Sequence, residues 1–352
     1  MLKRRRFLTI AASCAALDGV FAASAPGADS ASNTSVWKGV AMGALASITI
    51  VHQDRGHARA LIESCVQEIE RLEAIFSLYR PDSALSRLNA AGELADPPTE
   101  LVELLSFSLG LARLTGGAFD PTVQPLFELY LAHFARPGAP ASGPSAQFIE
   151  QTLQRVGFGA VEVGADRIRL RRPGAAITLN GVAQGFVTDR VADLMKRGGL
   201  ENVLVNLGEG RAAGRRADGE HWHASVTDPA APGRPLFELT LGSEAGMLSA
   251  LATSGGYGTR FGADPLVHHL LDPVIGRSVN HFASVSVAAP RATLADGLST
   301  ALAILPPART QALLAAYPRA RAWLVDAAGH VTTAGAIAVR TDANGAHPAA
   351  VA

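Results

Sequence analysis

Strand-like and helix-like patterns are mixed along this 352-residue chain without strict alternation. Alternating apolar residues predict strands between Trp37 and Val51. Apolar residues at helical spacing predict a long helix around Cys65, which ends near residue 80 because Pro81 cannot continue it. Such a mixture is typical of a layered α+β architecture. We therefore expect one α+β domain over residues 36–340, without an internal repeat.

The same two periodicities predict the remaining elements. Turns are expected at Gly39 and Gly43, and a Pro/Gly/Ser loop at residues 137–144. The run formed by residues 176–179, 182–196 and 203–207 has the strand–helix–strand order of a β–α–β unit. Further helices are expected at residues 99–114, 145–156, 292–305 and 308–317, and further strands at 161–163, 168–170, 222–226, 236–241, 284–288 and 322–325.

The first 25 residues have the pattern of an export signal. Basic residues from Lys3 to Arg6 precede Phe7 and a modest apolar stretch, and small residues around Ala23 suit cleavage. The arginine run is typical of a twin-arginine signal, with a Sec signal as the alternative. We therefore expect an exported, periplasmic protein that loses residues 1–25.

Two cysteines occur in the chain, and neither indicates redox chemistry. Cys14 lies in the leader, where Ala11 and a short apolar run do not favour a lipoprotein anchor. Cys65 lies on the apolar stripe of its helix, where a lone cysteine usually packs as a small hydrophobe. Residues 341–352 are small and polar, and we expect a disordered tail there.

The charge balance excludes some classes of partner. The whole chain is formally neutral, and removing the leader leaves 27 basic and 30 acidic residues. Nothing in this balance favours binding to nucleic acid or to a polyanionic surface. No apolar run beyond the N-terminus is long enough to span a bilayer.

The segment ADGLSTAL contains two candidate ligands of a cation. Asp296 and Thr300 are four residues apart, which places both oxygens on one face of the predicted helix, outside the core. Hard oxygen ligands suit a magnesium-type cation, which completes its shell with waters and substrate phosphates. Upstream, HHLLDPVIG predicts a rigid loop with His268 and His269. Adjacent histidines point to different sides of an extended chain, which favours a base or a hydrogen-bond donor near phosphate over a zinc pair.

Glycine-containing motifs predict places where the backbone approaches a ligand. In TGGAFDPTVQPL the glycines allow close approach and Phe119 could pack against an aromatic ring of a ligand. Taken alone, the motif is better explained as a helix cap and turn. In TLNGVAQGFVTDRV the backbone near Gly181 can offer an N–H to phosphate or a carbonyl to a metal at a helix start. Small residues there also suit helix packing, and Asp189 is expected to be a surface or capping residue.

The segment TSGGYGTRF offers hydrogen-bonding groups and one cation. Ser254 and Tyr257 can bond a ligand, and Arg260 can offset phosphate charge. Ser254 has no G-x-S-x-G nucleophile elbow around it, so a serine hydrolase is disfavoured.

Eight motifs together carry a family resemblance. MGALASITI, FSLYRPDSALSRLN, TGGAFDPT, GVAQGFVTD, NLGEG, SGGYGTRF, HHLLDP and ADGLSTAL occur in the order and spacing of the ApbE family. Over roughly residues 37–326 the chain resembles these FAD:protein FMN transferases. The resemblance implies an α+β fold whose two lobes enclose FAD in a cleft. It also implies cleavage of FAD at its pyrophosphate, transfer of FMN to a Thr or Ser hydroxyl of a partner protein, and release of AMP.

The resemblance further implies site residues. Such a reaction needs a divalent cation, here Mg²⁺, and a group that deprotonates the acceptor hydroxyl. The Gly181 carbonyl, Asp296 and Thr300 would hold the cation, and His269 is the candidate base or phosphate-positioning group. The expected FAD contacts are Met42, Tyr79, Ala118, Phe119, Asp120 and Leu270, with Thr178, Gln184, Ser254 and Tyr257 completing the cofactor-binding set.

Three motifs depart from the family pattern. An Asp–Leu pair and a Lys–Gly pair read here as Thr178–Leu179 and Gln184–Gly185, and the signature NLGGD reads NLGEG, with Glu209 before Gly210. Gln184 can still form hydrogen bonds, but without charge. Because charge-assisted hydrogen bonds contribute about 1.5–3 kcal/mol, FAD binding could be weakened tenfold or more.

The altered helix and the leader together resemble the NosX-like branch, which is linked to flavinylation of membrane proteins in nitrous-oxide respiration. The expected partner is therefore an acceptor protein with an FMN-binding domain, membrane-associated and respiratory, and no oligomeric state is predicted. Two other functions stay open: a non-catalytic periplasmic protein that binds FAD or FMN, and an FAD pyrophosphatase that releases FMN and AMP to water.

Overall fold

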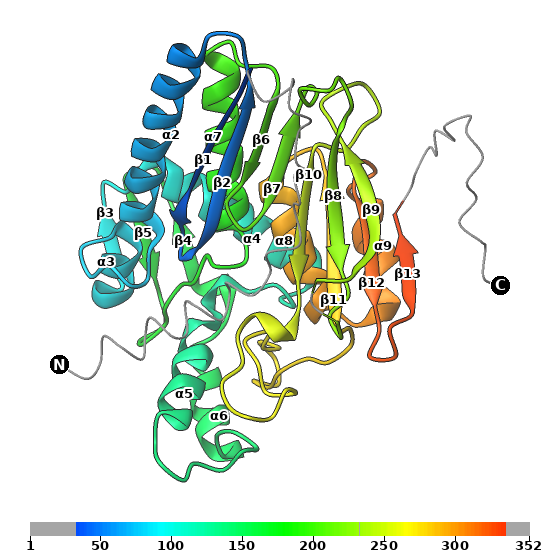
Figure 1. The fold of residues 1–352 in the computed structure, drawn as a ribbon. Helices are drawn as coiled ribbons and strands as arrows, with labels where there is room; N and C mark the ends of the chain where they lie inside the picture. The colour runs from blue at the N-terminus through cyan, green and yellow to red at the C-terminus, as the bar shows by residue number, and fades with distance from the viewer. Residues whose placement is uncertain (1–32, 232, 336–352) are drawn as a thin grey trace.

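The fold is built on an eight-stranded sheet in which all neighbouring strands are antiparallel (Figure 1). The structure is a computed structural model that describes residues 33–231 and 233–335. The predicted leader and tail lie outside these residues. In spatial order the strands are β1 (Thr34–Ala41), β2 (Ala44–Val51), β6 (Val203–Asn206), β7 (Gly210–Ala213), β10 (Ala250–Ser254), β11 (Ser284–Ala289), β12 (Arg321–Val325) and β13 (Val331–Ala334).

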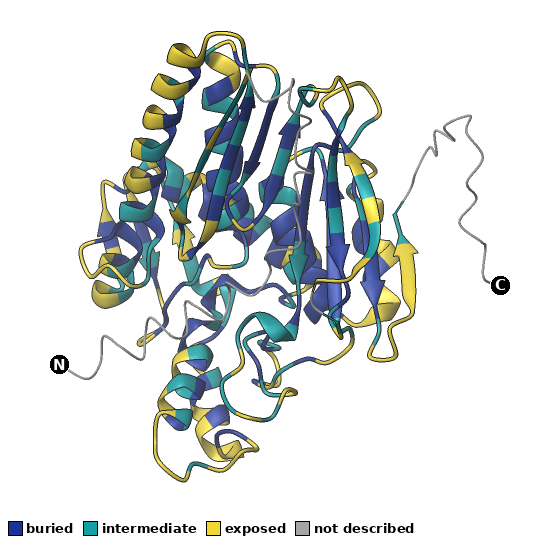
Figure 2. Cartoon of the chain, viewed as in Figure 1, coloured by how far each residue is buried: buried dark blue, intermediate teal, exposed yellow. Residues whose placement is uncertain are grey.

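Three helices cover one face of this sheet (Figure 1). They are α2 (Arg55–Phe76), α7 (Ala183–Arg197) and α8 (Ala292–Ile304). Helix α8 packs on β10 and β11, α7 lies between α8 and α2, and α2 also contacts β1. Their apolar faces form the main core with the sheet. The outer face of α2 is exposed, whereas α8 has no exposed residue and α7 is exposed only at Lys196 and Arg197 (Figure 2). The layered α+β architecture predicted from the sequence is confirmed.

A two-stranded hairpin covers part of the opposite sheet face. It consists of β8 (Trp222–Thr227) and β9 (Pro235–Leu241). Trp222 of β8 is buried in a second apolar cluster with Leu204, Leu251 and Trp323 of the large sheet. The sheet is thus enclosed between helices on one side and, in part, this hairpin on the other.

The smaller elements surround the helical layer. The helices α3 (Ala84–Ala91) and α4 (Thr99–Thr115) precede a projecting pair, α5 (Gln124–Phe134) and α6 (Ala146–Leu153), and α9 (Thr310–Ala315) lies near β13. A three-stranded sheet has the order β3 (Glu93–Ala95), β5 (Arg167–Leu170), β4 (Val161–Val163). At one end of the molecule, α5, α6 and the long segment 255–283 form a smaller lobe with its own apolar cluster (Figure 1).

Helix α2 shows how the sequence sets an element. Asp54 accepts the His57 N–H at 2.9 Å and caps the helix start, and the helix ends at Phe76, earlier than expected. Cys65 is fully buried on the apolar stripe, and burial raises the pKa of its thiol to about 12. The prediction that Cys65 is a core residue is confirmed.

Two sequence predictions about the sheet are wrong. Residues 176–179 do not form a strand, because the Asn89 side chain bonds both the N–H and the carbonyl of Ile177 at 2.7 and 2.8 Å. The Asn89 side chain thus forms the hydrogen bonds with the Ile177 backbone that a neighbouring strand would otherwise form. The β–α–β unit therefore does not exist, and β6 pairs antiparallel with β2 and β7. Gly39 lies inside β1 rather than in a turn, and a Cβ there would meet the Trp37 ring at 2.4 Å.

Candidate active site

A cavity of about 830 Å³ lies where the large sheet, α8 and the smaller lobe meet. Its walls include side chains from β2, β6, β10, the start of α5 and the segment 255–273. Its size is in the range of cofactor-binding cavities. Most of the site residues predicted from the sequence line it: Ala118, Phe119, Asp120, Thr178, Gly181, Gln184, Ser254, Tyr257, His269, Leu270, Asp296 and Thr300.

Two predicted FAD contacts are not among the lining residues. Met42 lies in the β1–β2 turn with a positive φ of 51°, and its N–H donates to Glu73 Oε1 at 2.5 Å. The Tyr79 side chain follows α2 and is 69% exposed. Their contact with FAD stays a prediction.

The contact between α7 and α8 brings together the predicted cation ligands. Asp296 Oδ2 accepts the Gly185 N–H at 2.9 Å, and Thr300 Oγ1 lies 3.5 Å from the Gly181 carbonyl oxygen. Both glycines are needed for this approach. A Cβ on residue 185 would lie 2.4 Å from the Ala292 carbonyl oxygen, and a Cβ on residue 181 would lie 3.0 Å from Thr300 Oγ1. Gly185 therefore allows α7 and α8 to pack closely, and Gly181 also lines the cavity.

Asp296 is buried, which corrects the expectation that it lies outside the core. Only 4% of the residue is exposed. Burial raises the pKa of its carboxyl to about 7, although the Gly185 N–H acts in the opposite direction. A buried carboxylate that also faces a cavity favours a cation as its partner.

Glu209 is a second buried carboxylate on the same cavity. It follows Gly208 in the turn between β6 and β7 and is 8% exposed. Burial and the neighbouring charge of Asp296 raise the pKa of its carboxyl well above the ordinary range. Glu209 was not predicted as a site residue. The available signal was the departure of NLGEG from the family signature, which places a carboxylate in a glycine turn.

The donor set fits a hard divalent cation. Asp296 offers a carboxylate, Thr300 a hydroxyl and Gly181 a backbone carbonyl, which are the oxygen ligands that Mg²⁺ prefers. Among the described residues, no group of three or more His, Cys, Asp or Glu side chains could hold a metal ion. A cation here would therefore depend on these mixed oxygen donors.

The two adjacent histidines have different surroundings, although their ring centroids lie only 6.3 Å apart and both rings lie against the segment 256–258. His269 lines the cavity, whereas His268 is buried beside Asn280 and is not a lining residue. His269 Nδ1 lies 3.2 Å from the Thr259 carbonyl oxygen, so that nitrogen carries the proton and Nε2 keeps its lone pair. Burial lowers the pKa of His269 to about 4, which keeps the ring neutral near pH 7.

Asp120 accepts three hydrogen bonds that fix the cavity wall near Phe119. Its Oδ1 accepts the Thr122 N–H and hydroxyl at 2.8 and 2.6 Å, and its Oδ2 accepts the Phe158 N–H at 2.9 Å. Burial raises the pKa of its carboxyl, and these three hydrogen bonds act in the opposite direction. The loop that carries Phe119 is thereby fastened to the 3₁₀ helix Phe158–Ala160.

Gln184 and Ser254 complete the polar lining. Gly208 has a φ of +100°, and a Cβ there would lie 2.5 Å from Gln184 Nε2, so the glutamine packs against the NLGEG turn. Ser254 Oγ lies 2.8 Å from Ser299 Oγ and 3.2 Å from Thr300 Oγ1. Burial, with the nearby Glu209, raises the pKa of Tyr257 to about 12.

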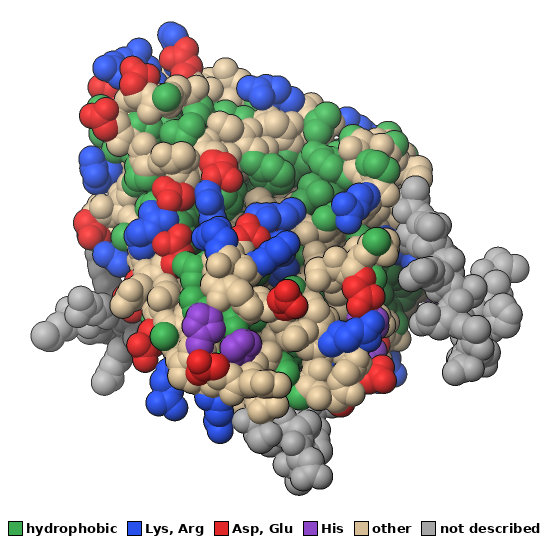
Figure 3. Space-filling model, turned by 90° about the horizontal axis from the view of Figure 1, so that it is seen from above, with side chains coloured by type: hydrophobic (Ala, Val, Ile, Leu, Met, Phe, Trp, Pro, Cys, Tyr) green, Lys and Arg blue, Asp and Glu red, His purple; other side chains and the backbone are tan. Residues whose placement is uncertain are grey.

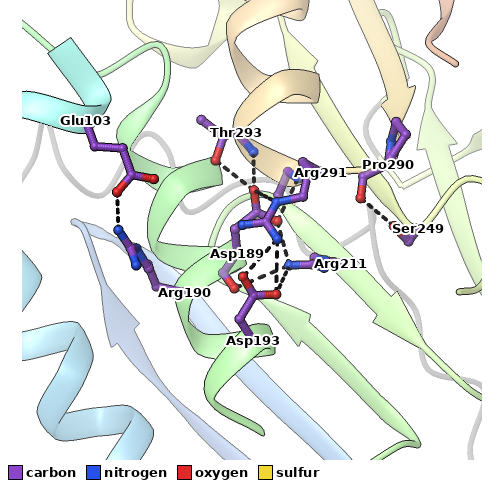
Figure 4. Close-up of polar contacts among 10 residues, drawn as sticks. Glu103, Asp189, Arg190, Asp193, Arg211, Ser249, Pro290, Arg291 and Thr293 are labelled. Atoms are coloured by element: carbon purple, nitrogen blue, oxygen red, sulfur yellow. Dashed lines mark hydrogen bonds and ion pairs between the residues drawn. The ribbon is translucent and has the colours of Figure 1, made fainter. Parts of the chain in front are cut away.

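A buried network fixes α8 against α7 (Figure 4). Asp189 accepts the Ala292 and Thr293 N–H groups, each at 3.0 Å, and therefore caps α8 from α7. Arg211 donates to Asp189 at 2.9 Å, and Arg291 pairs with Asp189 at 3.2 Å. Of the two roles expected for Asp189, capping is the one that the structure shows.

The outer surface has no uniform sign of charge on the face shown in Figure 3, where acidic and basic side chains of the described residues are interspersed with apolar ones. In the described part of the chain, no helix is both long and apolar enough to cross a membrane.

Proteins of known structure share this fold and are similar in sequence. Flavin transferase ApbE from Vibrio cholerae has a TM-score of 0.73 and 26% identity, covering 86% of this chain and 97% of that chain. The apo form of the flavinyl transferase ApbE of Pseudomonas stutzeri has a TM-score of 0.71 and 28% identity, covering 86% and 95%. Both of these solved structures are flavin transferases.

The sequence comparisons give the family. The ApbE family model matches residues 42–325, and the chain belongs to the ApbE family. An FAD:protein FMN transferase of Klebsiella pneumoniae (strain 342) is 29% identical over 307 residues, which cover 85% of this chain and 86% of that protein. One from Treponema pallidum (strain Nichols) is 30% identical over 280 residues, which cover 74% and 75%. The family resemblance found in the sequence is confirmed, and the NosX-like branch stays a prediction.

Proposed function

We propose that this protein transfers FMN from FAD to a threonine or serine hydroxyl of a partner protein. The observation that carries the proposal is that His269, Asp296 and Thr300 all line one cavity in a chain of the ApbE family. The acceptor oxygen attacks the phosphorus of the FMN half of FAD. A new P–O bond forms, the pyrophosphate bond breaks, AMP leaves, and the acceptor hydroxyl loses its proton.

His269 is suited to take that proton. Its Nδ1 proton is held by the Thr259 carbonyl, so Nε2 is the nitrogen with a free lone pair. The low pKa of the ring keeps it unprotonated at neutral pH, which is the state that a base requires. Because His268 is held by Asn280, it does not compete for this role.

The oxygen donors at the α7–α8 contact would hold the divalent cation. Asp296, Thr300 and the Gly181 carbonyl would bind Mg²⁺, which when bound offsets the negative charge of the two phosphates. Asp296 is held in place by the Gly185 N–H, and Thr300 is positioned by its contact with Ser254. The site would therefore be largely formed before FAD binds.

Gln184 sets the affinity for FAD in this proposal. The family lysine at this position would add a positive charge beside the nucleotide, whereas Gln184 offers only neutral hydrogen bonds. The cation and the neutral polar groups then bear more of the phosphate charge, and FAD binding depends more strongly on Mg²⁺.

The acceptor and the cellular location are also proposed. The leader-like residues 1–25 support export to the periplasm, where an acceptor with an FMN-binding domain would meet the enzyme. The leader and the altered α7 sequence support a membrane-associated respiratory acceptor. Detection of the protein in a periplasmic fraction after expression of the full chain tests the location, and retention in the cytoplasm would contradict it.

A transfer assay separates the three candidate functions. The protein is incubated with FAD, Mg²⁺ and a purified FMN-binding domain with an acceptor threonine, and flavin fluorescence is read in a denaturing gel. Fluorescence on the acceptor, with one AMP released per flavin attached, supports the transferase. AMP and free FMN without a labelled acceptor would indicate a pyrophosphatase. Bound FAD without AMP would indicate a binding protein.

A further inference from the structure

We propose that Glu209 is a second carboxylate ligand of the divalent cation, and that it acts together with Asp296. The inference rests on the proposed cation site and adds to it a residue of this chain that the family signature does not contain. It starts from the position of Glu209, which lines the same cavity as Asp296, Thr300 and Gly181.

The turn between β6 and β7 directs Glu209 inward. Gly208 adopts a φ of +100°, which favours glycine, and the Leu207 N–H donates to the Glu209 carbonyl at 3.0 Å. The Thr188 hydroxyl of α7 also donates to that carbonyl, at 3.2 Å. The Glu209 backbone is thus fixed from two sides, and the residue is 92% buried beside the cavity.

A short series of contacts links Glu209 to the other oxygen donors. Its carboxylate accepts a hydrogen bond from the Thr253 N–H of β10. The next residue, Ser254, places its hydroxyl 3.2 Å from Thr300 Oγ1, and Thr300 in turn approaches Gly181. Glu209 precedes β7, Gly181 precedes α7, and the other two predicted ligands lie on α8. All of them line the same cavity.

This region brings two buried carboxyl groups close together. Glu209 and Asp296 are near enough for the charge of one to affect the other, and both are buried. In the described part of the chain, neither carboxylate forms an ion pair with Lys or Arg. Two buried carboxylates are costly unless a positive charge accompanies them. Mg²⁺ is commonly bound through one or two carboxylates together with substrate phosphates, which matches this pair.

Binding of Mn²⁺ alone, without FAD, tests the inference. Mn²⁺ prefers the same oxygen donors and can be titrated by electron paramagnetic resonance. We expect the purified protein to bind Mn²⁺, and Glu209→Gln and Asp296→Asn each to weaken that binding about tenfold or more, because each removes one charged ligand. Glu238→Gln, which removes an exposed carboxylate of β9, is the matched control and should bind as the wild type does.

Thermal unfolding provides a second readout that does not require activity. In EDTA, Glu209→Gln should unfold at no lower temperature than the wild type, because a buried charge has been removed. Added Mn²⁺ should raise the unfolding temperature of the wild type more than that of the variant. If Glu209→Gln does not fold, Glu209→Asp retains the charge and withdraws the carboxylate by one methylene group. It should still weaken Mn²⁺ binding several-fold.

The outcomes distinguish this inference from the proposed function. A wild type that binds no Mn²⁺ without FAD, or a Glu209→Gln or Glu209→Asp variant that binds Mn²⁺ as tightly as the wild type, would overturn it. If FMN transfer is observed but Glu209→Gln leaves Mn²⁺ affinity unchanged, only this inference fails. If Glu209→Gln weakens Mn²⁺ binding but no transfer occurs, the cation site stands and the transferase proposal fails.

Discussion

Asp296 Oδ2 accepts the backbone N–H of Gly185 at 2.9 Å, so a predicted cation ligand on α8 also caps the first turn of α7. Helix α7 has no side-chain cap of its own, because Val182 occupies the N-cap position. A carboxylate near a helix N-terminus is stabilised by the unpaired N–H groups and the helix dipole. The site and the packing of the two central helices are therefore coupled through one residue.

Substitution of Asp296 should separate these two roles. Asp296→Asn keeps an oxygen for the Gly185 N–H but loses the charge, so we expect AMP formation to be abolished while the free energy of unfolding changes by about 1 kcal/mol or less. Asp296→Ala also leaves a buried N–H unpaired and should cost a further ~1–3 kcal/mol. Release of AMP and denaturation by urea measure the two effects. Full activity of Asp296→Asn would show that the metal assignment is wrong.

The network around Asp189 should contribute to stability rather than to chemistry. Asp189→Ala removes the cap of α8 and leaves Arg211 and Arg291 with fewer partners, so we expect a loss of about 3 kcal/mol in urea denaturation. Glu103→Gln breaks the more exposed ion pair with Arg190 (Figure 4) and should cost at most about 1 kcal/mol. Equal effects of the two substitutions would contradict the buried capping role.

His269 should make the fold less stable as the pH falls. The pKa of the ring is lowered from 6.5 to about 4 in the folded protein, so below pH 6.5 the unfolded chain binds a proton that the folded chain does not. The resulting contribution to stability is complete above pH 6.5 and is lost as the pH falls toward 4. In urea denaturation from pH 7.5 to 4.5, the wild type should therefore lose more stability than His269→Gln. Parallel pH profiles of the two proteins would contradict the burial of the ring.

Substitution of Gln184 should reveal whether this position faces the nucleotide. Gln184→Lys restores a positive charge on the cavity wall and should tighten FAD binding about tenfold, measured by the quenching of flavin fluorescence. Gln184→Met has a similar length without charge or hydrogen bonds, and should bind FAD no more tightly than the wild type. An affinity of Gln184→Lys equal to that of the wild type would place residue 184 away from the phosphates.

Elements with a strong helical period could be predicted from the sequence. Helices α4, α7 and α8 begin within one residue of their expected positions, because their apolar residues repeat on one face over several turns. Helices α3 and α5 were missed, although the shorter α6 and α9 were predicted. The strand expected at residues 176–179 failed because the distant side chain of Asn89 took the place of a neighbouring strand.

Part of the candidate site could likewise be predicted from the sequence, and part could not. The pairing of Asp296 with Thr300 follows from local helix geometry. Which of the two adjacent histidines lines the cavity depends on the fold of the segment 255–273. The environment of Glu209 depends on contacts between β7, β10 and α8, which are distant in sequence. The burial of Asp296 likewise results from the packing of α8 on α7, and spacing within one helix does not reveal it.

The most direct test of FMN transfer at this cavity is the intact mass of an FMN-binding acceptor domain after incubation with this protein, FAD and Mg²⁺. With the wild type, we expect the mass of the acceptor to increase by one FMN less one water, and no increase in EDTA or with a variant acceptor that has alanine in place of the threonine. With Asp296→Asn, the mass should stay unchanged. An unmodified acceptor after incubation with the wild type, or modification by Asp296→Asn at the wild-type rate, would contradict the assignment of this cavity as the transfer site.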